Sequence, residues 1–291
     1  MAPTRKSIDS SKFIDIDENV VKNYPVVSSS ISKIQAQDAE DHKNIYEDQD
    51  IVAAKRVIHF LYELWKKESF VDVKFQTADV EVFAHRVILG AHSPVLLEML
   101  QKQSCNHMVS LDLYDVSSTD CKDVLKFLYT SDINLTDENI NGVLRSSIRM
   151  NIETLRKICS DYLSQYSVEN ALSYHAVCIN NNLLLLAAKI WQYICENFEE
   201  LSNQDEFMQQ SLDDIIIILS EDRLNVSSEM VVVNSAIMWL RKNSHKILNV
   251  NEIWDCIRFP LIQPEQLLQL ENYQYMSNNP EIQSKIYNAI W

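Results

Sequence analysis

The residues with the clearest catalytic potential are Asp72, His85 and Arg86. A carboxylate, an imidazole and a guanidinium lie within 15 residues of one another in a chain of 291. Such a set could transfer protons or hold an anion. No nucleophile with an orienting base accompanies these residues, so the pattern favours a structural role over catalysis.

A zinc site is the second chemical alternative. It would draw its ligands from a set of histidines and cysteines, namely His85, His92, Cys105, His107 and Cys121. Structural zinc sites use closely spaced ligand pairs, and only Cys105-x-His107 comes near that spacing. The six cysteines stand singly, without a C-x-x-C pair. We therefore expect reduced, mostly buried thiols, no metal and no cofactor.

Glycine is scarce, which limits the possible chemistry further. Gly90 and Gly142 are the two glycines of the chain. They cannot form a phosphate-binding loop, a dinucleotide fingerprint or a nucleophile elbow. Folds rich in tight turns, such as β-propellers, are disfavoured because their turns need glycine at positive φ. The sequence predicts that the protein is not an enzyme.

The chain is strongly acidic. It has 26 Lys and Arg against 41 Asp and Glu, a formal net charge of −15. This charge argues against a nucleic-acid partner, because such binding depends on neutralising phosphates. The run Ile215–Leu219 is far shorter than a membrane span, and the N-terminus lacks the apolar stretch of a signal peptide. We expect a soluble protein of the cytoplasm or nucleus with no membrane partner.

The pattern along the chain changes twice. Residues 1–50 hold 6 basic and 10 acidic residues without a sustained apolar period, which predicts a disordered acidic tail. Residues 52–65 form a helix that is apolar on more than one stripe. Alternation predicts strands at 70–75 and 80–83, and 108–111 is a third candidate strand.

Helical patterns dominate the remainder of the chain. Ser93-Pro94 and Ser117 or Ser118 are placed to begin helices. Beyond about residue 150 the apolar spacing is helical throughout. Ile215–Leu219 has the composition of a buried strand, but the preceding Ser211 and the helical surroundings favour a short buried helix. The predicted fold is an α/β module followed by an all-α module.

Ordered motifs in the first module resemble a BTB (POZ) domain, which we place at residues 51–165. The motifs are Ser69–Val73, Phe83–Leu89, His92–Leu100 and Leu125–Ser131. The second module, residues 166–291, resembles a BACK domain. Its matching segments are Ser167–Ala171, Glu196–Phe198, Leu219–Val226, Trp239-Leu240 and Ile257–Ile262. Together the two modules are similar to the front portion of kelch-like proteins.

The resemblance implies an α/β BTB domain followed by an all-α BACK domain in an adaptor protein. BTB domains of this group form homodimers and bind cullin-three, while a kelch propeller recruits the substrate for ubiquitination. Two glycines cannot supply the paired glycines of even one kelch blade. We therefore expect the substrate module to be absent from this chain, which is either a fragment or a natural BTB–BACK protein. The family pattern also places Asp72 in a strand and His85 at the start of a neighbouring helix, as structural residues.

The helix at 52–65 carries the predicted dimer interface. It has more apolar surface than one domain face covers, and two copies about a two-fold axis would bury the surplus. The residues are Val57, Phe60, Leu61 and Leu64. The alternative is that the acidic tail or the BACK domain covers the same stripe.

The predicted cullin-binding residues come from the resemblance alone. They are Met99, Leu100, Tyr129, Tyr162 and Tyr174. For Met99, Leu100 and Tyr129 the alternative role is ordinary core packing. Relatives that bind cullin-three usually carry an apolar-x-Glu motif in the loop that corresponds to Gln101–His107, which has no Glu here.

Two functions remain open at this point. The first is a homodimeric adaptor that binds cullin-three and an unknown substrate protein. The second is a dimeric scaffold or regulator that pairs with relatives and does not engage the cullin.

Overall fold

The computed structural model describes residues 35–102, 107–243, 251–271, 276 and 279–290, without the side chains of residues 35–50 and 271. The chain divides into two compact units, residues 1–57 and 58–291. None of the described helices is both long and apolar enough to cross a membrane.

The first helix, α1, spans Gln35–Lys66 and begins earlier than the sequence pattern predicts. Its start lies inside the range 1–50 that we expected to be an acidic tail, while residues 1–34 of that range lie outside the described residues. Seven of the sixteen residues 35–50 are Gln, Ala or Glu, which favour a helix, and four are Asp, which favours it less. A search for amphipathic periodicity alone does not detect such a helix.

Three strands form a mixed sheet in the order β2-β1-β3. The strands are β1 (Val73–Thr77), β2 (Glu81–Ala84) and β3 (Val109–Leu113). β1 runs antiparallel to β2 and parallel to β3, with Val73 opposite Ala84 on one side and Val109 on the other. Alternate residues of β1 are buried, so one face of the sheet belongs to the core.

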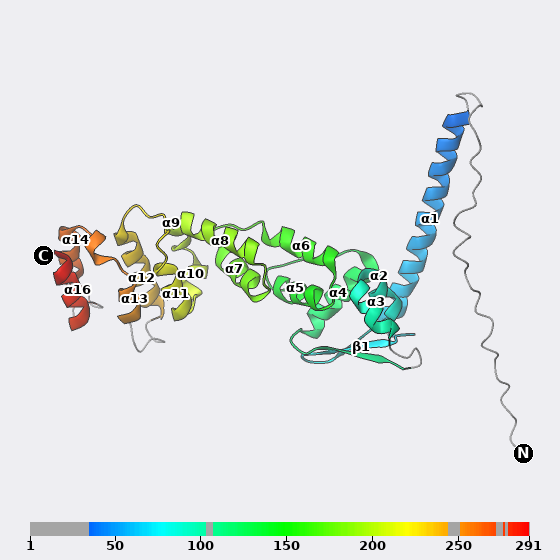
Figure 1. Cartoon of the computed structure of the whole chain (residues 1–291), viewed down its shortest axis with the longest axis horizontal. Helices are drawn as coiled ribbons and strands as arrows, with labels where there is room; N and C mark the ends of the chain where they lie inside the picture. The colour runs from blue at the N-terminus through cyan, green and yellow to red at the C-terminus, as the bar shows by residue number, and fades with distance from the viewer. Residues whose placement is uncertain (1–34, 103–106, 244–250, 272–275, 277–278, 291) are drawn as a thin grey trace, which may run out of the picture. The chain divides into compact units, whose positions relative to one another are not determined.

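The first group of helices adjoins this sheet, and its later members pack on the earlier helices (Figure 1). They are α2 (Arg86–His92), α3 (Pro94–Gln101), α4 (Ser118–Thr130), α5 (Ile140–Arg149) and α6 (Glu153–Leu163). Ser93 and Ser117 cap α3 and α4 by accepting backbone N–H groups of Leu96 and Asp120 at 3.2 and 3.1 Å. The helix starts predicted at these serines are confirmed.

The rest of the described chain is helical, as the sequence predicts. The elements are α7 (Ala171–Asn180), α8 (Leu184–Glu196), α9 (Phe198–Leu201), α10 (Asp205–Gln209), α11 (Leu212–Leu219), α12 (Glu229–Asn243), α13 (Asn251–Asp255), a 3-10 turn η2 (Phe259–Leu261), α14 (Pro264–Glu271) and α16 (Pro280–Ile290). The run Ile215–Leu219 is a helix capped by Ser211, which confirms that prediction.

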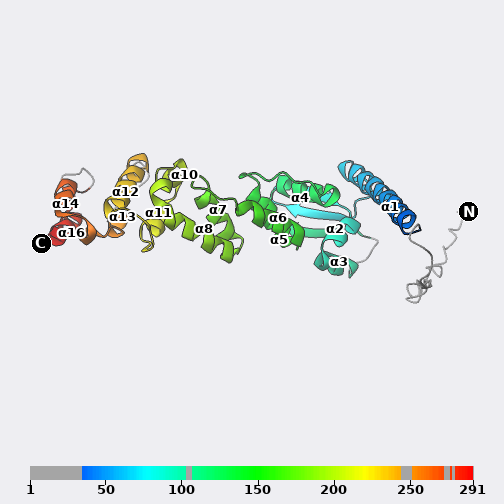
Figure 2. The same ribbon diagram turned by 90° about the horizontal axis from the view of Figure 1, so that it is seen from above.

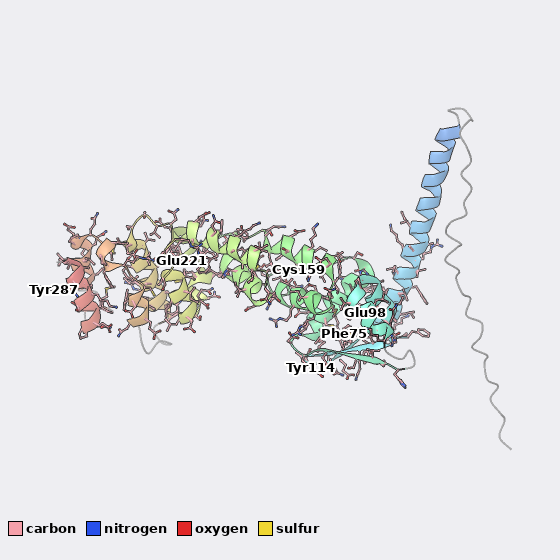
Figure 3. All side chains as sticks on the ribbon, in the orientation of Figure 1. Phe75, Glu98, Tyr114, Cys159, Glu221 and Tyr287 are labelled. Carbon is pink, nitrogen blue, oxygen red and sulfur yellow. The ribbon has the colours of Figure 1, made fainter. Side chains whose placement is uncertain are left out.

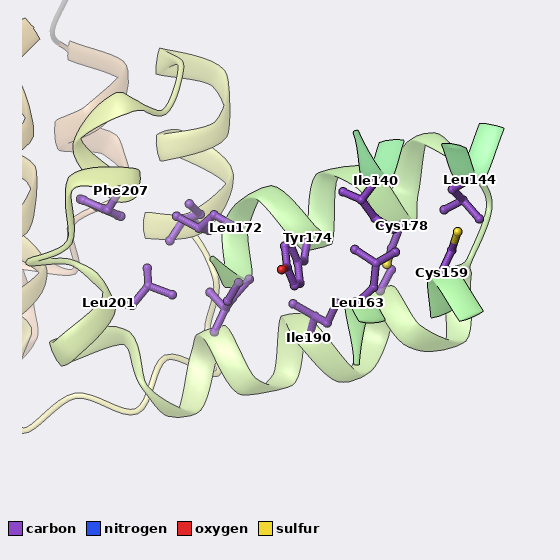
Figure 4. Close-up of a cluster of buried hydrophobic side chains, with 14 of the residues drawn as sticks. Ile140, Leu144, Cys159, Leu163, Leu172, Tyr174, Cys178, Ile190, Leu201 and Phe207 are labelled. Atoms are coloured by element: carbon purple, nitrogen blue, oxygen red, sulfur yellow. The ribbon is translucent and has the colours of Figure 1, made fainter. Parts of the chain in front are cut away.

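One apolar core continues from the α/β part into the first helices of the all-α part. Ile140 and Leu144 on α5 and Cys159 and Leu163 on α6 are all at most 1% exposed. Figure 4 shows them in one cluster with side chains of α7 and α8. In Figure 2 the α7–α8 pair lies beside α5 and α6. This continuity couples the packing of the two modules.

The two glycines serve close helix packing and not turns. Neither Gly90 nor Gly142 has a positive φ. A Cβ at Gly142 would overlap the carboxyl group of Asp120 on α4, and a Cβ at Gly90 would meet the flexible Cδ1 of Leu97 at 2.8 Å. Among the described residues, positive φ is taken by other residue types, namely Glu68, Phe70, Ser131, Asn151 and Asn182. Scarce glycine therefore does not exclude left-handed backbone in this chain.

We predict that Gly142→Ala destabilises the protein by about 1 kcal/mol. The added methyl displaces Asp120 from its hydrogen bond with Ser117. Overpacking of this kind costs roughly 1–3 kcal/mol, and the higher helix propensity of Ala offsets about 1 kcal/mol of that cost. Gly90→Ala is the matched control and should be near neutral, because Leu97 can rotate away. Urea unfolding of both variants tests this difference, and equal stabilities would contradict it.

Candidate functional site

An aromatic cluster, buried except for the half-buried Trp65, joins the end of α1 to the sheet and to α4. We call Trp65, His85 and Tyr129 the Tyr129 cluster. The rings of Trp65 and Tyr129 are stacked at 5.1 Å between centroids and 16° between planes. The indole N–H of Trp65 donates to the carbonyl of Phe83 on β2 at 2.8 Å. The last turn of α1 is thereby held against the sheet.

His85 completes the Tyr129 cluster with three hydrogen bonds. Its backbone N–H donates to the Tyr129 hydroxyl at 3.2 Å, and its Nδ1 lies 2.7 Å from the same oxygen. Its Nε2 lies 2.9 Å from the carbonyl of Ser69, which can only accept. A neutral ring with its proton on Nε2 satisfies all three contacts. The partners of the imidazole are thus a phenol and a backbone carbonyl.

Asp72 and Arg86 form a separate structural contact. One oxygen of Asp72 accepts the backbone N–H of Arg86 at 2.6 Å, and the other lies 3.6 Å from the guanidinium. The guanidinium also donates to the carbonyls of Leu100 and His107 at 3.3 and 3.4 Å. These bonds hold the start of α2, the end of α3 and the segment before β3 together. Asp72, His85 and Arg86 therefore do not converge on a common reactive point.

The described cysteines offer no reactive thiol. Five of them are free and buried, namely Cys121, Cys159, Cys178, Cys195 and Cys256. Burial raises the pKa of Cys121 and of Cys159 to about 12, so the thiolate form is negligible near neutral pH. No group of three or more His, Cys, Asp or Glu side chains in the described part of the chain could hold a metal ion.

The residues of the predicted dimer interface differ in burial. Val57 and Phe60 are 58% and 62% exposed. Leu61 and Leu64 are half-buried, and Leu61 packs against the core of its own domain. Part of the stripe therefore packs inside the domain, at Leu61, and part of it is exposed apolar surface, at Val57 and Phe60.

Two further apolar residues near the sheet, Phe70 and Val87, are exposed although the sequence pattern does not indicate it. Phe70 is 84% exposed with φ of 60°, an unusual conformation for a bulky residue, and Val87 is 65% exposed. Phe70 lies three residues before Val73 and Val87 three residues after Ala84, which pair with each other. Both residues therefore lie near the same end of the sheet. The alternating pattern of residues 70–75 predicts that Phe70 is a core residue of a strand. The sequence therefore gives no indication that Phe70 is exposed.

Three of the predicted cullin-binding residues are core residues. Leu100 and Tyr129 are each 1% exposed and Tyr174 is 4% exposed. Side chains this buried present almost no surface to a partner in this structure, and a binding role for these three residues stays a prediction. Their apolar and aromatic types match core and interface equally well, and only the packing distinguishes the two.

The remaining two predicted residues reach the surface. Met99 on α3 and Tyr162 on α6 are each half-buried. Val95 lies one helical turn before Met99 and is 57% exposed. Glu98, labelled in Figure 3, pairs with Lys102 at 2.6 Å on the exposed side of the same helix. The exposed face of α3 therefore combines apolar and charged groups. Residues 103–106 of the following loop lie outside the described residues.

Comparisons with known proteins account for both modules. The family model for the BTB/POZ domain matches residues 61–167, and the model described as BTB And C-terminal Kelch (BACK) matches residues 171–272. This chain is a BTB–BACK protein. The predicted family and fold class are confirmed.

The relatives of this BTB–BACK protein include kelch-like proteins. Mouse Kelch-like protein 41 is 28% identical over 232 residues, which are 78% of this chain and 38% of the relative. Human Kelch-like protein 3 is 28% identical over 255 residues, 86% of this chain and 43% of the relative. This chain thus spans less than half the length of these relatives. A solved BTB domain of zebrafish PATZ1 is 21% identical, with 39% of this chain and 93% of that chain covered and a TM-score of 0.35.

Hydrogen bonds connect the BTB and BACK domains in addition to their common apolar core. The Asp137 carboxylate of the BTB domain accepts the hydroxyls of Tyr162 and Tyr174 at 2.9 and 2.6 Å. Tyr174 belongs to α7, the first BACK helix. A second bond runs from the side-chain amide of Asn181 to Asn141 at 2.9 Å. Tyr162 and Tyr174 thus have a structural role at the domain boundary.

We predict that Tyr129→Phe destabilises the BTB domain by about 1–3 kcal/mol. The change leaves the backbone N–H and Nδ1 of His85 buried without their partner. Tyr287→Phe, at a 63% exposed tyrosine of α16, is the control and should leave stability unchanged. Thermal and urea unfolding measure both variants, and unchanged stability of Tyr129→Phe would contradict the assigned bonds.

Proposed function

We propose that this BTB–BACK protein is a homodimeric, non-enzymatic adaptor that binds cullin-three and brings partner proteins to ubiquitin transfer. The observation that carries the proposal is the exposed apolar face at the end of α1, next to the rigid Tyr129 cluster. The similarity to kelch-like proteins supports the adaptor role. The free cysteines support a reducing compartment, such as the cytoplasm or nucleus.

The dimer would form through the exposed part of α1. Trp65, which stacks on Tyr129, lies between one and two turns after Phe60 on α1. The Tyr129 cluster therefore fixes the position of Phe60. In a two-fold interface each residue is buried twice, and burying one Phe side chain contributes about 1.5–3 kcal/mol. Val57, Leu61 and Leu64 extend the stripe along the helix. Phe70 and Val87 supply further apolar surface at the end of the sheet.

The cullin would bind on the exposed face of α3. Val95 and Met99 are one turn apart and accessible, while Leu100 supports the helix from the core. Tyr162 is also accessible in part, although its hydroxyl is used by Asp137. A helix of the partner could lie on such a face.

A second function is supported by one specific feature, the composition of the loop Gln101–His107. It contains no Glu, so the acidic side chain usual in cullin-binding relatives is missing. In this alternative the protein is a dimeric regulator that pairs with relatives and leaves the cullin unbound.

We expect wild-type protein to be a dimer and Phe60→Asp to be a folded monomer. The substitution would place two carboxylates in an apolar interface, which strongly opposes association. Val80→Asp, at a 53% exposed apolar position of the BTB domain, is the matched control and should remain dimeric. Light scattering coupled to size exclusion gives the masses. A monomeric wild type, or a Phe60→Asp variant with dimer mass, would refute the interface.

Titration calorimetry with the N-terminal region of cullin-three separates the two functions. The adaptor proposal predicts a complex, and Met99→Asp should weaken it at least tenfold, about 1.4 kcal/mol. Val80→Asp again serves as the control and should bind like wild type. No complex at tens of micromolar cullin would overturn the adaptor proposal and favour the dimeric regulator.

A further inference from the structure

The BACK domain carries an apolar groove that belongs neither to the dimer face nor to the α3 face. We call it the BACK groove. Its lining comes from α7, α8 and α11, and consists of His175, Ile179, Leu184, Ala187, Ala188, Trp191 and Ile217. Three of these side chains are strongly exposed: Ile179 at 47%, Leu184 at 62% and Ile217 at 58%. Large apolar side chains gathered in this way commonly mark an interaction site.

The spacing of the lining residues gives the groove a direction. His175 and Ile179 are one turn apart on α7, and Leu184, Ala188 and Trp191 follow each other at four and three residues on α8. Both rows therefore run along their helix axes. The small Ala187 and Ala188 leave room between the larger side chains. The groove has a volume of about 330 Å³, enough for a few apolar side chains of a partner helix.

The walls of the BACK groove are held in place without a ligand. The indole of Trp191 donates to the Glu221 carboxylate at 2.8 Å, and its ring lies 4.9 Å from that of His175. Glu221, labelled in Figure 3, also binds the guanidinium of Arg223 at 2.8 Å. These bonds lower the pKa of Glu221 to about 2 and keep it ionised, and the contact with Arg223 has the largest effect. A preformed wall reduces the entropic cost of binding.

The α11 edge of the groove is acidic. Asp213 and Asp214 are exposed and lie one turn before Ile217 on the same helix. Asp214 is close enough to His175 to favour its protonated form, although burial has the larger effect and lowers the pKa of His175. The charge of Glu221 is paired with Arg223, so these two aspartates supply the net negative charge.

The sequence around the BACK groove is also negatively charged. From Ala171 to Ser220 the sequence has one basic residue, Lys189, against seven acidic residues. Lys189 lines the neighbouring depression beside Leu185 and not the BACK groove. A second copy of this chain would bring a like-charged surface to the groove, which disfavours self-association there.

We propose that the BACK groove binds a basic amphipathic helix of a partner protein, with apolar side chains between α7, α8 and α11 and basic side chains along Asp213 and Asp214. This site goes beyond the adaptor function proposed above. It provides a partner surface on the BACK domain that is independent of the BTB dimer.

The direct test is fluorescence anisotropy of the full chain with two labelled synthetic peptides. One is an amphipathic leucine–lysine helix, and the other is a leucine–glutamate helix with the same apolar face. The leucine–lysine peptide should bind at least tenfold more tightly at physiological salt. Equal binding of the two peptides, or no binding of either, would overturn the proposal.

Matched variants then assign binding to the groove. Leu184→Ser should weaken the leucine–lysine peptide at least fivefold, while Leu261→Ser, at a leucine 68% exposed on η2, should leave it unchanged. Thermal unfolding checks that both variants fold. Equal binding by Leu184→Ser and wild type would show that the peptide binds elsewhere, and would overturn the proposal.

A charge variant tests the acidic edge separately. Asp213→Asn/Asp214→Asn should reduce the preference for the leucine–lysine peptide at least threefold. Asp132→Asn/Glu138→Gln removes the same charge from exposed positions of the BTB domain and should not. Equal loss in both double variants would indicate nonspecific attraction to an acidic protein. A lower oligomeric mass of Leu184→Ser would instead identify a second copy as the occupant, and either result would contradict the proposal.

Discussion

Tyr129 connects the elements on which the BTB surface depends. Its ring stacks on Trp65 of α1, and its hydroxyl serves both the backbone and the ring of His85, at the junction of β2 and α2. Burial raises the pKa of this phenol above its usual value, so the hydroxyl keeps its proton and can donate to Nδ1. Because Trp65 is also bonded to β2, the rotation of the last turns of α1 about the helix axis is determined by these contacts.

That rotation decides which apolar residues of α1 remain available to a partner. The side of the helix with Trp65 is used inside the domain, and Leu61 also packs against the core. Phe60 is consequently turned away from the core and stays exposed. The proposed dimer face is thus a result of internal packing. The same contacts engage His85, and Asp72 and Arg86 are engaged in backbone contacts nearby, which leaves these residues with structural roles.

The BACK domain is joined to the BTB domain by both apolar and polar contacts. Asp137 accepts two tyrosine hydroxyls from α6 and α7, and Tyr174 of α7 also belongs to the apolar cluster shown in Figure 4. One side of the α7–α8 pair is occupied by this core. The other side, with Ile179, Leu184 and Trp191, forms the BACK groove next to α11. The first BACK helices therefore combine a structural side and an accessible side.

The sequence by itself determined the order of the two modules, the approximate positions of the strands, the serine-capped helix starts and the helical state of Ile215–Leu219. These features depend on neighbouring residues through periodicity and capping, so they can be recognised along the chain. The family motifs also lie within short segments. The start of α1 was missed because helix propensity acts there without an apolar stripe.

Only the tertiary structure decided which apolar and aromatic residues are accessible. Leu100, Tyr129 and Tyr174 fit a binding site by residue type but are core residues, whereas Phe70 fits a strand and is exposed. The glycines also needed the fold, since both allow close helix contacts and left-handed backbone occurs at other residues. Burial and close approach depend on segments far apart in sequence, and no local pattern records which segments meet.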